Sequence, residues 1–132
     1  MQSKHGSYNI QLIGNVVKFD GKGPWDEVAV IRYRRDMQAT IQSLNGINWA
    51  FMGYFHGAAV LPPQAEEDLS AVVAWRIENG MRACSIVLSD TSCPAIVRSQ
   101  FERIYTKAGI KHRFFYEEEE AYEWLSQLGF SQ

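Results

Sequence analysis

Apolar residues recur along this chain with two different periods, and the change of period divides it into elements. Alternation from Tyr8 to Leu12, followed after Gly14-Asn15 by Val16 to Phe19, predicts a β-hairpin. Two nearly continuous apolar runs, residues 49–55 and 83–88, predict strands that are covered on both faces. Residues 112–116 predict a last short strand.

Four segments carry apolar residues at helical spacing. The first starts near Trp25 and ends at Asn45-Gly46, the second runs from Pro63 to Glu78, the third begins at Pro94, and the last begins at Glu117–Glu120. The residues expected to face inward are Val30, Tyr33, Met37, Ile41 and Leu44; Ala65, Leu69, Val72, Val73 and Ile77; Val97, Phe101, Ile104, Tyr105 and Ala108; and Ala121, Trp124, Leu125 and Leu128.

The order of these elements is β-β-α-β-α-β-α-β-α. Alternation of this kind predicts an α/β fold, with a mixed, mainly parallel sheet of five strands and four helices. The first strand is expected to be antiparallel and to lie at an edge. A single domain is expected over residues 1–132, with the polar residues 1–7 disordered.

Several short motifs resemble those of a known family. They are Gly23-Pro24-Trp25 after the second strand, Trp49-Ala50 at the start of the third, and Phe114-Phe115-Tyr116 followed by Ala121 and Trp124-Leu125. With the element order, they resemble the SpoIIAA-like fold of STAS domains, the bacterial anti-sigma-factor antagonists. More narrowly, the chain resembles a group of small SpoIIAA-like bacterial proteins that carry the STAS/SEC14 label, over roughly residues 8–130.

The sequence departs from that family at its regulatory site. The antagonists carry a phosphorylatable serine just after the third strand, whereas this chain has His56, Gly57, Ala58 and Ala59 there. No Ser or Thr occurs between Leu44 and Leu69. The resemblance therefore implies a regulatory or protein-interaction module that lacks the phosphoserine and is not an enzyme.

Composition narrows the functional classes. A net charge of -2 and a pI near 5.9 do not favour a nucleic-acid binder. No apolar run approaches the roughly 20 residues of a membrane span, and the N-terminus lacks a signal-peptide pattern, so a cytoplasmic location is expected. The two cysteines and three histidines show no metal-ligand spacing. Accordingly, neither a metal nor a cofactor is expected.

The end of the third strand is the first candidate site. Tyr54 and His56 could line a cleft with Trp25 and Trp49, which would hold a small apolar ligand or lipid between the sheet and the second helix. The alternative is a polar loop histidine above packed aromatic rings. That alternative is favoured because no Asp or Glu lies close in sequence to orient His56.

Two further candidates surround the predicted start of the third helix. Cys93 precedes Pro94, a position that makes a thiol more nucleophilic and suggests, remotely, a thiol-dependent enzyme. The alternative is a half-buried capping cysteine without a resolving thiol. Ser89, Thr91 and Ser92 could bind an anion at the same helix end, or simply cap it.

Self-association is a further expectation. Trp75 falls beside the main apolar stripe of the second helix, and an exposed tryptophan there would mark an interface. A homodimer is therefore expected through the second helix or through the edge of the hairpin. As an interaction module, the chain is also expected to bind a protein partner.

Overall fold

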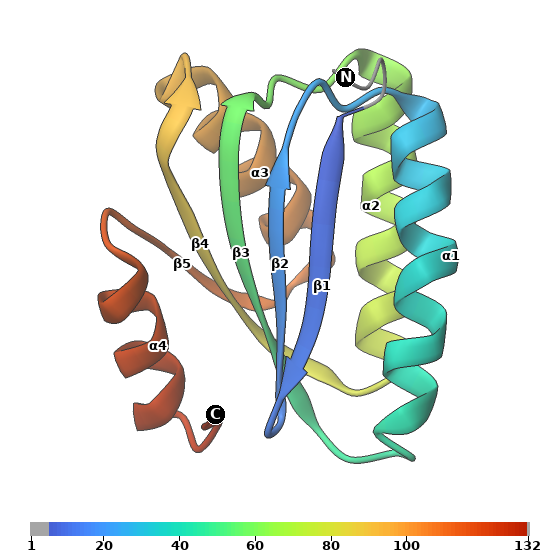
Figure 1. The fold of residues 1–132 in the computed structure, drawn as a ribbon, viewed down its shortest axis with the longest axis vertical. Coiled ribbons are helices and arrows are strands. Elements are labelled where there is room, and N and C mark those ends of the chain that lie inside the picture. The colour runs from blue at the N-terminus through green and yellow to red at the C-terminus, as the bar shows by residue number, and fades with distance from the viewer. Residues whose placement is uncertain (1–5, 132) are drawn as a thin grey trace.

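A computed structural model describes residues 6–131, and its nine elements follow the predicted order (Figure 1). The strands and helices are β1 (Ser7–Ile13), β2 (Val16–Lys22), α1 (Glu27–Ser43), β3 (Trp49–Ala58), α2 (Pro63–Glu78), β4 (Met81–Ser92), α3 (Pro94–Ala108), β5 (Lys111–Phe115) and α4 (Glu118–Gln127). No helix within the described residues is long and apolar enough to cross a membrane.

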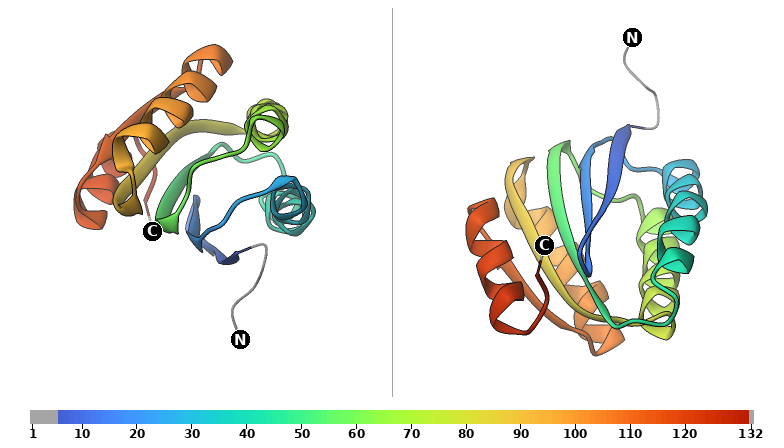
Figure 2. Two further views of the ribbon diagram at one scale, coloured as in Figure 1. Left: turned by 90° about the horizontal axis from the view of Figure 1, so that it is seen from above. Right: turned by 60° about the horizontal axis from the view of Figure 1, so that its bottom comes forward.

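The five strands form one mixed sheet in the order β1-β2-β3-β4-β5. β1 pairs antiparallel with β2 at the edge, and the remaining neighbours are parallel. Because β2 to β5 follow one another across the sheet in chain order, the right-handed crossovers all turn the same way and place α1, α2 and α3 on one face (Figure 2). The predicted α/β class, strand number and helix number are confirmed.

The main core lies between the sheet and these three helices. The apolar stripes predicted for α1 and α3 face it, and Trp25 and Trp49 are buried in it, with exposed fractions of 5% and 0%. The indole N–H of Trp49 donates to the carbonyl of Asn79, at 2.8 Å, which fixes the start of β3 against the end of α2.

α4 alone covers the opposite face, and only in part. Its Ala121 and Leu125 pack on Ala50, Met52 and Val87, over β3 and β4. After α4 the chain returns to the β-hairpin, where the Ser131 N–H donates to Asn15 at 2.9 Å. The carboxyl-end halves of β2 and β3 therefore remain uncovered on this face (Figure 1).

β3 and β4 are longer than the sequence predicted. β3 continues through His56 and Gly57 to Ala58, where a turn was expected, and β4 continues through the expected loop to Ser92. The two extensions pair with each other, which satisfies their backbone groups without a turn. Ser7 belongs to β1, contrary to the expected disorder, and residues 1–5 lie outside the described residues.

The Gly-Pro-Trp segment after β2 has a steric explanation. The Gly23 N–H donates to the carbonyl of His56 at 3.2 Å, and a Cβ on Gly23 would lie only 1.4 Å from the Ala58 carbonyl oxygen. Only glycine lets the chain leave β2 so close to the end of β3. Trp25 then turns into the main core.

Candidate functional site on the open sheet face

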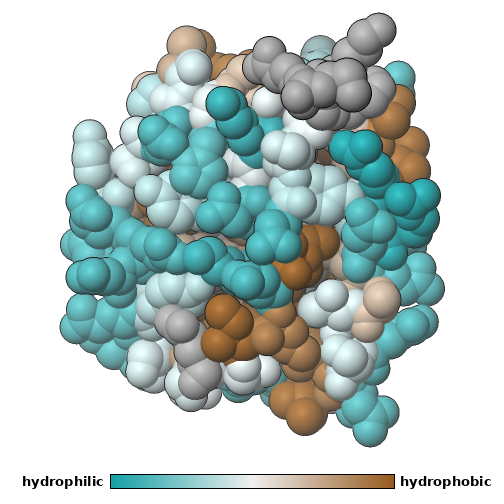
Figure 3. All heavy atoms as spheres, viewed as in Figure 1, coloured by the Kyte–Doolittle hydropathy of each residue, from teal (hydrophilic) through white to brown (hydrophobic). Residues whose placement is uncertain are grey.

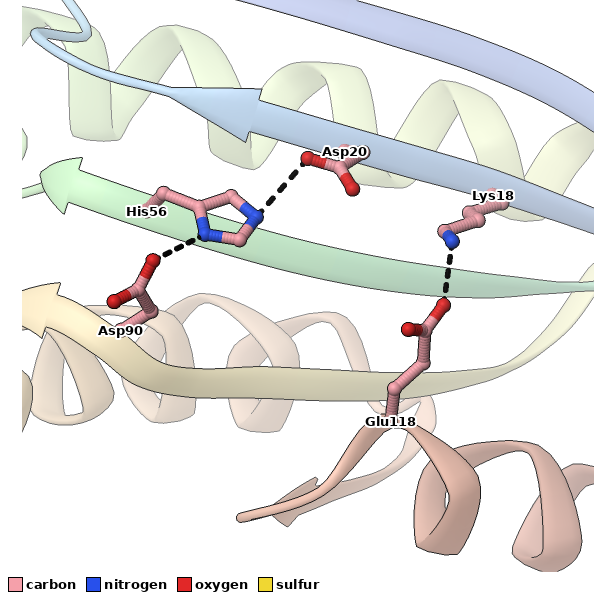
Figure 4. Close-up of polar contacts among 5 residues, drawn as sticks. All are labelled: Lys18, Asp20, His56, Asp90 and Glu118. Carbon is pink, nitrogen blue, oxygen red and sulfur yellow. Dashed lines mark hydrogen bonds and ion pairs between the residues drawn. The ribbon is translucent and has the colours of Figure 1, made fainter.

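His56 lies between two carboxylates at the carboxyl ends of the parallel strands (Figure 4). Its Nε2 atom is 3.0 Å from Asp20 Oδ1 on β2, and its Nδ1 atom is 2.5 Å from Asp90 Oδ2 on β4. All three side chains lie on the face that α4 leaves open. The histidine is partly buried, with 25% of its side chain exposed. Because a carboxylate contacts each of its two nitrogens, the ring is held in one orientation.

A β-bulge brings Asp90 to this face. Tyr54 pairs with Val87, but His56 pairs with Asp90, so β4 holds one more residue than β3 over this stretch. The extra residue reverses the alternation of side chains along β4. Without the bulge, Asp90 would point toward the helices on the other face.

Tyr54 supports the imidazole ring from the side of α4. The two rings stack with centroids 4.3 Å apart and planes 14° apart. Burial, and after it the negative charge of Asp90, raises the pKa of the Tyr54 hydroxyl. The phenol therefore stays neutral beside several carboxylates, where it can donate a hydrogen bond.

A second polar contact joins the open face to α4. Lys18 Nζ on β2 lies 2.5 Å from Glu118 Oε1 at the start of α4 (Figure 4). The lysine also lies over the Tyr122 ring, 6.0 Å from its centroid. Burial is the largest single effect and lowers the pKa of Lys18, but the Glu118 hydrogen bond and the charges of Tyr122, Glu118 and Asp20 together raise it by more, so the net shift is upward. The ion pair between Lys18 and Glu118 therefore holds the start of α4 against β2.

We define the acidic sheet face as Asp20, Tyr54, His56, Asp90 and Glu118, together with Lys18 and Glu117. Four carboxylates, those of Asp90, Glu118, Glu117 and Asp20, act on the Tyr54 hydroxyl. Lys18 is paired with one of them. Hydrophilic side chains extend across the middle of this face, with hydrophobic ones below them (Figure 3).

The contacts of His56 determine what the acidic sheet face can do chemically. A neutral imidazole has one N–H and one acceptor nitrogen, so only the protonated ring donates to both carboxylates at once. Each of the two ring nitrogens lies within hydrogen-bond distance of a carboxylate oxygen. Among residues 6–131, no group of three His, Cys, Asp or Glu side chains could hold a metal ion.

The four residues of the predicted ligand cleft do not come together. Trp25 and Trp49 lie in the core under the helices, whereas Tyr54 and His56 lie on the opposite face. The alternation of side chains along β3 already separates Trp49 from Tyr54 and His56, because it puts odd and even residues on different faces. The expected shared cleft is therefore not formed.

Two of the hydroxyl groups considered as anion ligands before α3 donate to backbone carbonyls instead. Ser89 donates to the Tyr116 carbonyl at 2.8 Å, and Thr91 donates to the Leu88 carbonyl at 2.6 Å, so neither proton is available to an anion. Ser92 is the exposed last residue of β4. Cys93 is the N-cap of α3, exposed and in a left-handed conformation, and its reactivity stays a prediction.

The two surfaces expected to support a homodimer lie on α2 and on the edge strand β1. Trp75 is only partly exposed, because Arg34 of α1 lies over its ring, 4.8 Å from the centroid. β1 is an edge strand on which Leu12 is 40% exposed. Self-association stays a prediction.

A small cavity lies on the helix side of the sheet, separate from the acidic sheet face. Its volume is about 30 Å³, and apolar and aromatic side chains form most of its wall. One charged residue, Arg76 of α2, lines it. The residues that line it include Phe19, Trp25, Tyr33, Phe51, Arg76 and Tyr105.

Sequence reasoning missed three functional candidates. Asp20 and Asp90 were overlooked because their nearness to His56 depends on strand pairing, which the local sequence does not contain. Arg76 could have been found from the sequence, because it lies seven positions after Leu69 and within the buried stripe of α2. Comparisons with family models, with curated proteins and with solved structures found no match.

Proposed function

We propose that the chain is a SpoIIAA-like regulatory or protein-interaction module that acts without a phosphoserine and without catalysis. The strand order, with three crossover helices on one face and α4 on the other, supports the resemblance drawn from the sequence. His56 stands near the place of the family's serine, at the end of β3. A fixed polar surface there takes the place of a switchable one.

The observation that carries this proposal is the ordered state of the acidic sheet face. Asp20 and Asp90 are held by His56, and Glu118 is held by Lys18, so the carboxylates are positioned before any partner arrives. Positioned charges lose little conformational entropy on binding and steer an oppositely charged partner. The partner is therefore a protein that presents lysine or arginine side chains to this face.

A capture experiment tests the proposal. The immobilised full chain is incubated with lysate of its own source cells and compared with two double variants. Asp20→Asn with Asp90→Asn removes the two carboxylates beside His56, and Glu67→Gln with Glu78→Gln removes two exposed carboxylates of α2 on the helix side. We expect the wild type and the α2 variant to retain the same partner protein, and salt to release it. The sheet variant is expected to retain at least tenfold less of that protein.

Equal retention of every protein by the two double variants would contradict an acidic docking surface. The salt dependence separates charge pairing from apolar adhesion, since exposed ion pairs weaken as ionic strength rises.

A second candidate function is the binding of a small ligand with an apolar body, and one observation favours it. The cavity between the sheet and α1, α2 and α3 is walled by aromatic rings and contains Trp25. Native mass spectrometry of the gently purified chain, compared with its denatured mass, tests this candidate. An added mass on the folded species supports it, and a bare monomer or dimer mass contradicts it.

A further inference from the structure

An open groove lies between α2 and α3, which pack side by side on the face of the sheet opposite to the acidic sheet face (Figure 2). Its volume is about 630 Å³. The exposed residues Ala71 and Ala74 of α2 line it, together with the buried Ile104 of α3. Because the two alanine side chains are short, another helix can approach α2 closely at this point.

The two walls of this groove carry opposite charges. α2 contributes Glu66 and Glu67, whereas α3 contributes Arg103 and Lys107. Arg103 and Glu66 form an ion pair across the groove. Glu67 and Lys107 are exposed, and neither forms an ion pair with another residue of the described range 6–131. Each wall therefore keeps one charge that the chain itself does not pair.

This separation of charge determines which partner fits the groove. A partner surface of a single sign would meet a like charge on one of the two walls, and like charges across an interface oppose binding. A second copy of the chain presents one wall of each sign. In a two-fold symmetric dimer, a contact from one copy to the other is made twice, so an acidic α2 wall can meet a basic α3 wall at both places.

The direction of the helices fits a two-fold axis that runs along the groove. α2 and α3 each follow a strand of the parallel pair β3 and β4, so both helices run in the same direction. Rotation about an axis along the groove keeps that direction and places α2 of each copy over α3 of the other. Glu67 of one copy then faces Lys107 of the other, and no acidic wall faces an acidic wall.

Exposed apolar side chains adjoin these charges. Ile96 of α3 is 54% exposed and lines a shallow hollow that shares Arg103 with the groove. Pro63, the first residue of α2, is exposed and lines the groove itself. In the two-fold arrangement, the start of α2 in one copy covers the start of α3 in the other. Ile96 and Pro63 are then removed from water, which favours association.

We propose that the groove between α2 and α3 is the contact surface of a homodimer, in which α2 of each copy packs on α3 of the other and Glu67 pairs with Lys107 of the second copy. Of the two surfaces expected from the sequence, self-association is thereby placed on α2 and not on the edge of β1. The acidic sheet face stays exposed in both copies, because it lies on the opposite face of the sheet, so the dimer presents it twice.

Analytical ultracentrifugation of the full chain over a concentration series tests this contact, and a dimer is expected. Glu67→Lys and Lys107→Glu each turn both symmetric contacts repulsive, and each is expected to raise the dissociation constant of the dimer at least tenfold. Glu123→Lys makes the same charge change at an exposed position of α4, on the other face of the sheet, and is expected to leave it unchanged. A monomer at every concentration overturns the proposal.

Mixing the two single variants tests the pairing itself. The Glu67→Lys chain has a lysine at both positions, and the Lys107→Glu chain has a glutamate at both. Neither is expected to associate with itself, but an equimolar mixture is expected to form heterodimers, because each lysine then faces a glutamate. Native mass spectrometry distinguishes the heterodimer from both homodimers. Absence of the heterodimer, or a dimer that survives each single change, overturns the contact.

The dimer goes beyond the proposed function, and the variants keep the two apart. The Asp20→Asn, Asp90→Asn variant is expected to lose the basic partner protein and to remain a dimer. The Glu67→Lys variant is expected to lose the dimer and to retain the partner, because its acidic sheet face is intact. Loss of the dimer in the Asp20→Asn, Asp90→Asn variant would place the contact on the acidic sheet face and overturn the groove as its site.

Discussion

The Nδ1 atom of His56 lies 2.5 Å from a carboxylate oxygen of Asp90, a residue 34 positions further along the chain. A single extra residue in β4 makes this contact, since it turns Asp90 to the face on which His56 lies. The contact fixes a polar surface at the carboxyl ends of β2, β3 and β4.

The Asp90→Asn variant is expected to separate function from stability at this contact. Because 66% of the Asp90 side chain is exposed, the ion pair contributes at most about 1 kcal/mol to the free energy of unfolding. Urea unfolding measures the stability, and capture of the basic partner measures the function. A loss of several kcal/mol would show that the pair is a structural element and not a docking feature.

Arg76→Met is expected to leave the free energy of unfolding within about 1 kcal/mol of the wild-type value, or to increase it. Removing an uncompensated buried charge offsets the lost hydrogen bond to Tyr33. Chemical denaturation of the wild type and the variant checks this. A loss of about 3–5 kcal/mol would instead indicate that a partner among the protein groups neutralises the guanidinium.

Stability is expected to fall as the pH rises above about 9, and Cys84 contributes the first part of that fall. The folded state raises its pKa from 9.0 to about 12, so between these values the unfolded chain releases the thiol proton and the folded chain keeps it. Each such group lowers the free energy of unfolding by about 1.4 kcal/mol per pH unit.

The Cys84→Ala variant serves as the control for that pH dependence. Its decline is expected to begin about one pH unit later, where Tyr33 begins to titrate in the unfolded state from its ordinary value of 10.0. Unfolding curves between pH 8 and pH 11 measure both proteins; an identical decline in the two would contradict the assignment to Cys84.

Gly23→Ala is expected to destabilise the fold by about 3 kcal/mol or more, because its Cβ would collide with the Ala58 carbonyl oxygen. Gly46→Ala is the matched control, since Gly46 has a positive φ of 84° but no atom within 4 Å of an added Cβ. The control is expected to lose only about 1–2 kcal/mol, the cost of a left-handed residue with a side chain. Equal losses would show that backbone conformation, and not the close approach of β2 and β3, accounts for Gly23.

The elements of this fold were predictable because their signals are local. The stripe from Val30 to Leu44 buries one side of α1, and α2 begins and ends at the residues that Pro63 and Asn79-Gly80 predict. The apolar runs that start β3 and β4 likewise predict central parallel strands. Periodicity and capping act over a few residues, so the sequence contains them directly.

By itself the sequence therefore determined the α/β class, the order of the elements, the antiparallel edge strand and the inward stripes. Only the tertiary structure decided which side chains meet. His56 contacts Asp20 and Asp90 through strand pairing and a bulge, and Arg76 and Trp25 share a cavity because α2 and the segment after β2 pack on the same face of the sheet. Such contacts depend on register and on the packing of distant segments, which no local pattern of residues specifies.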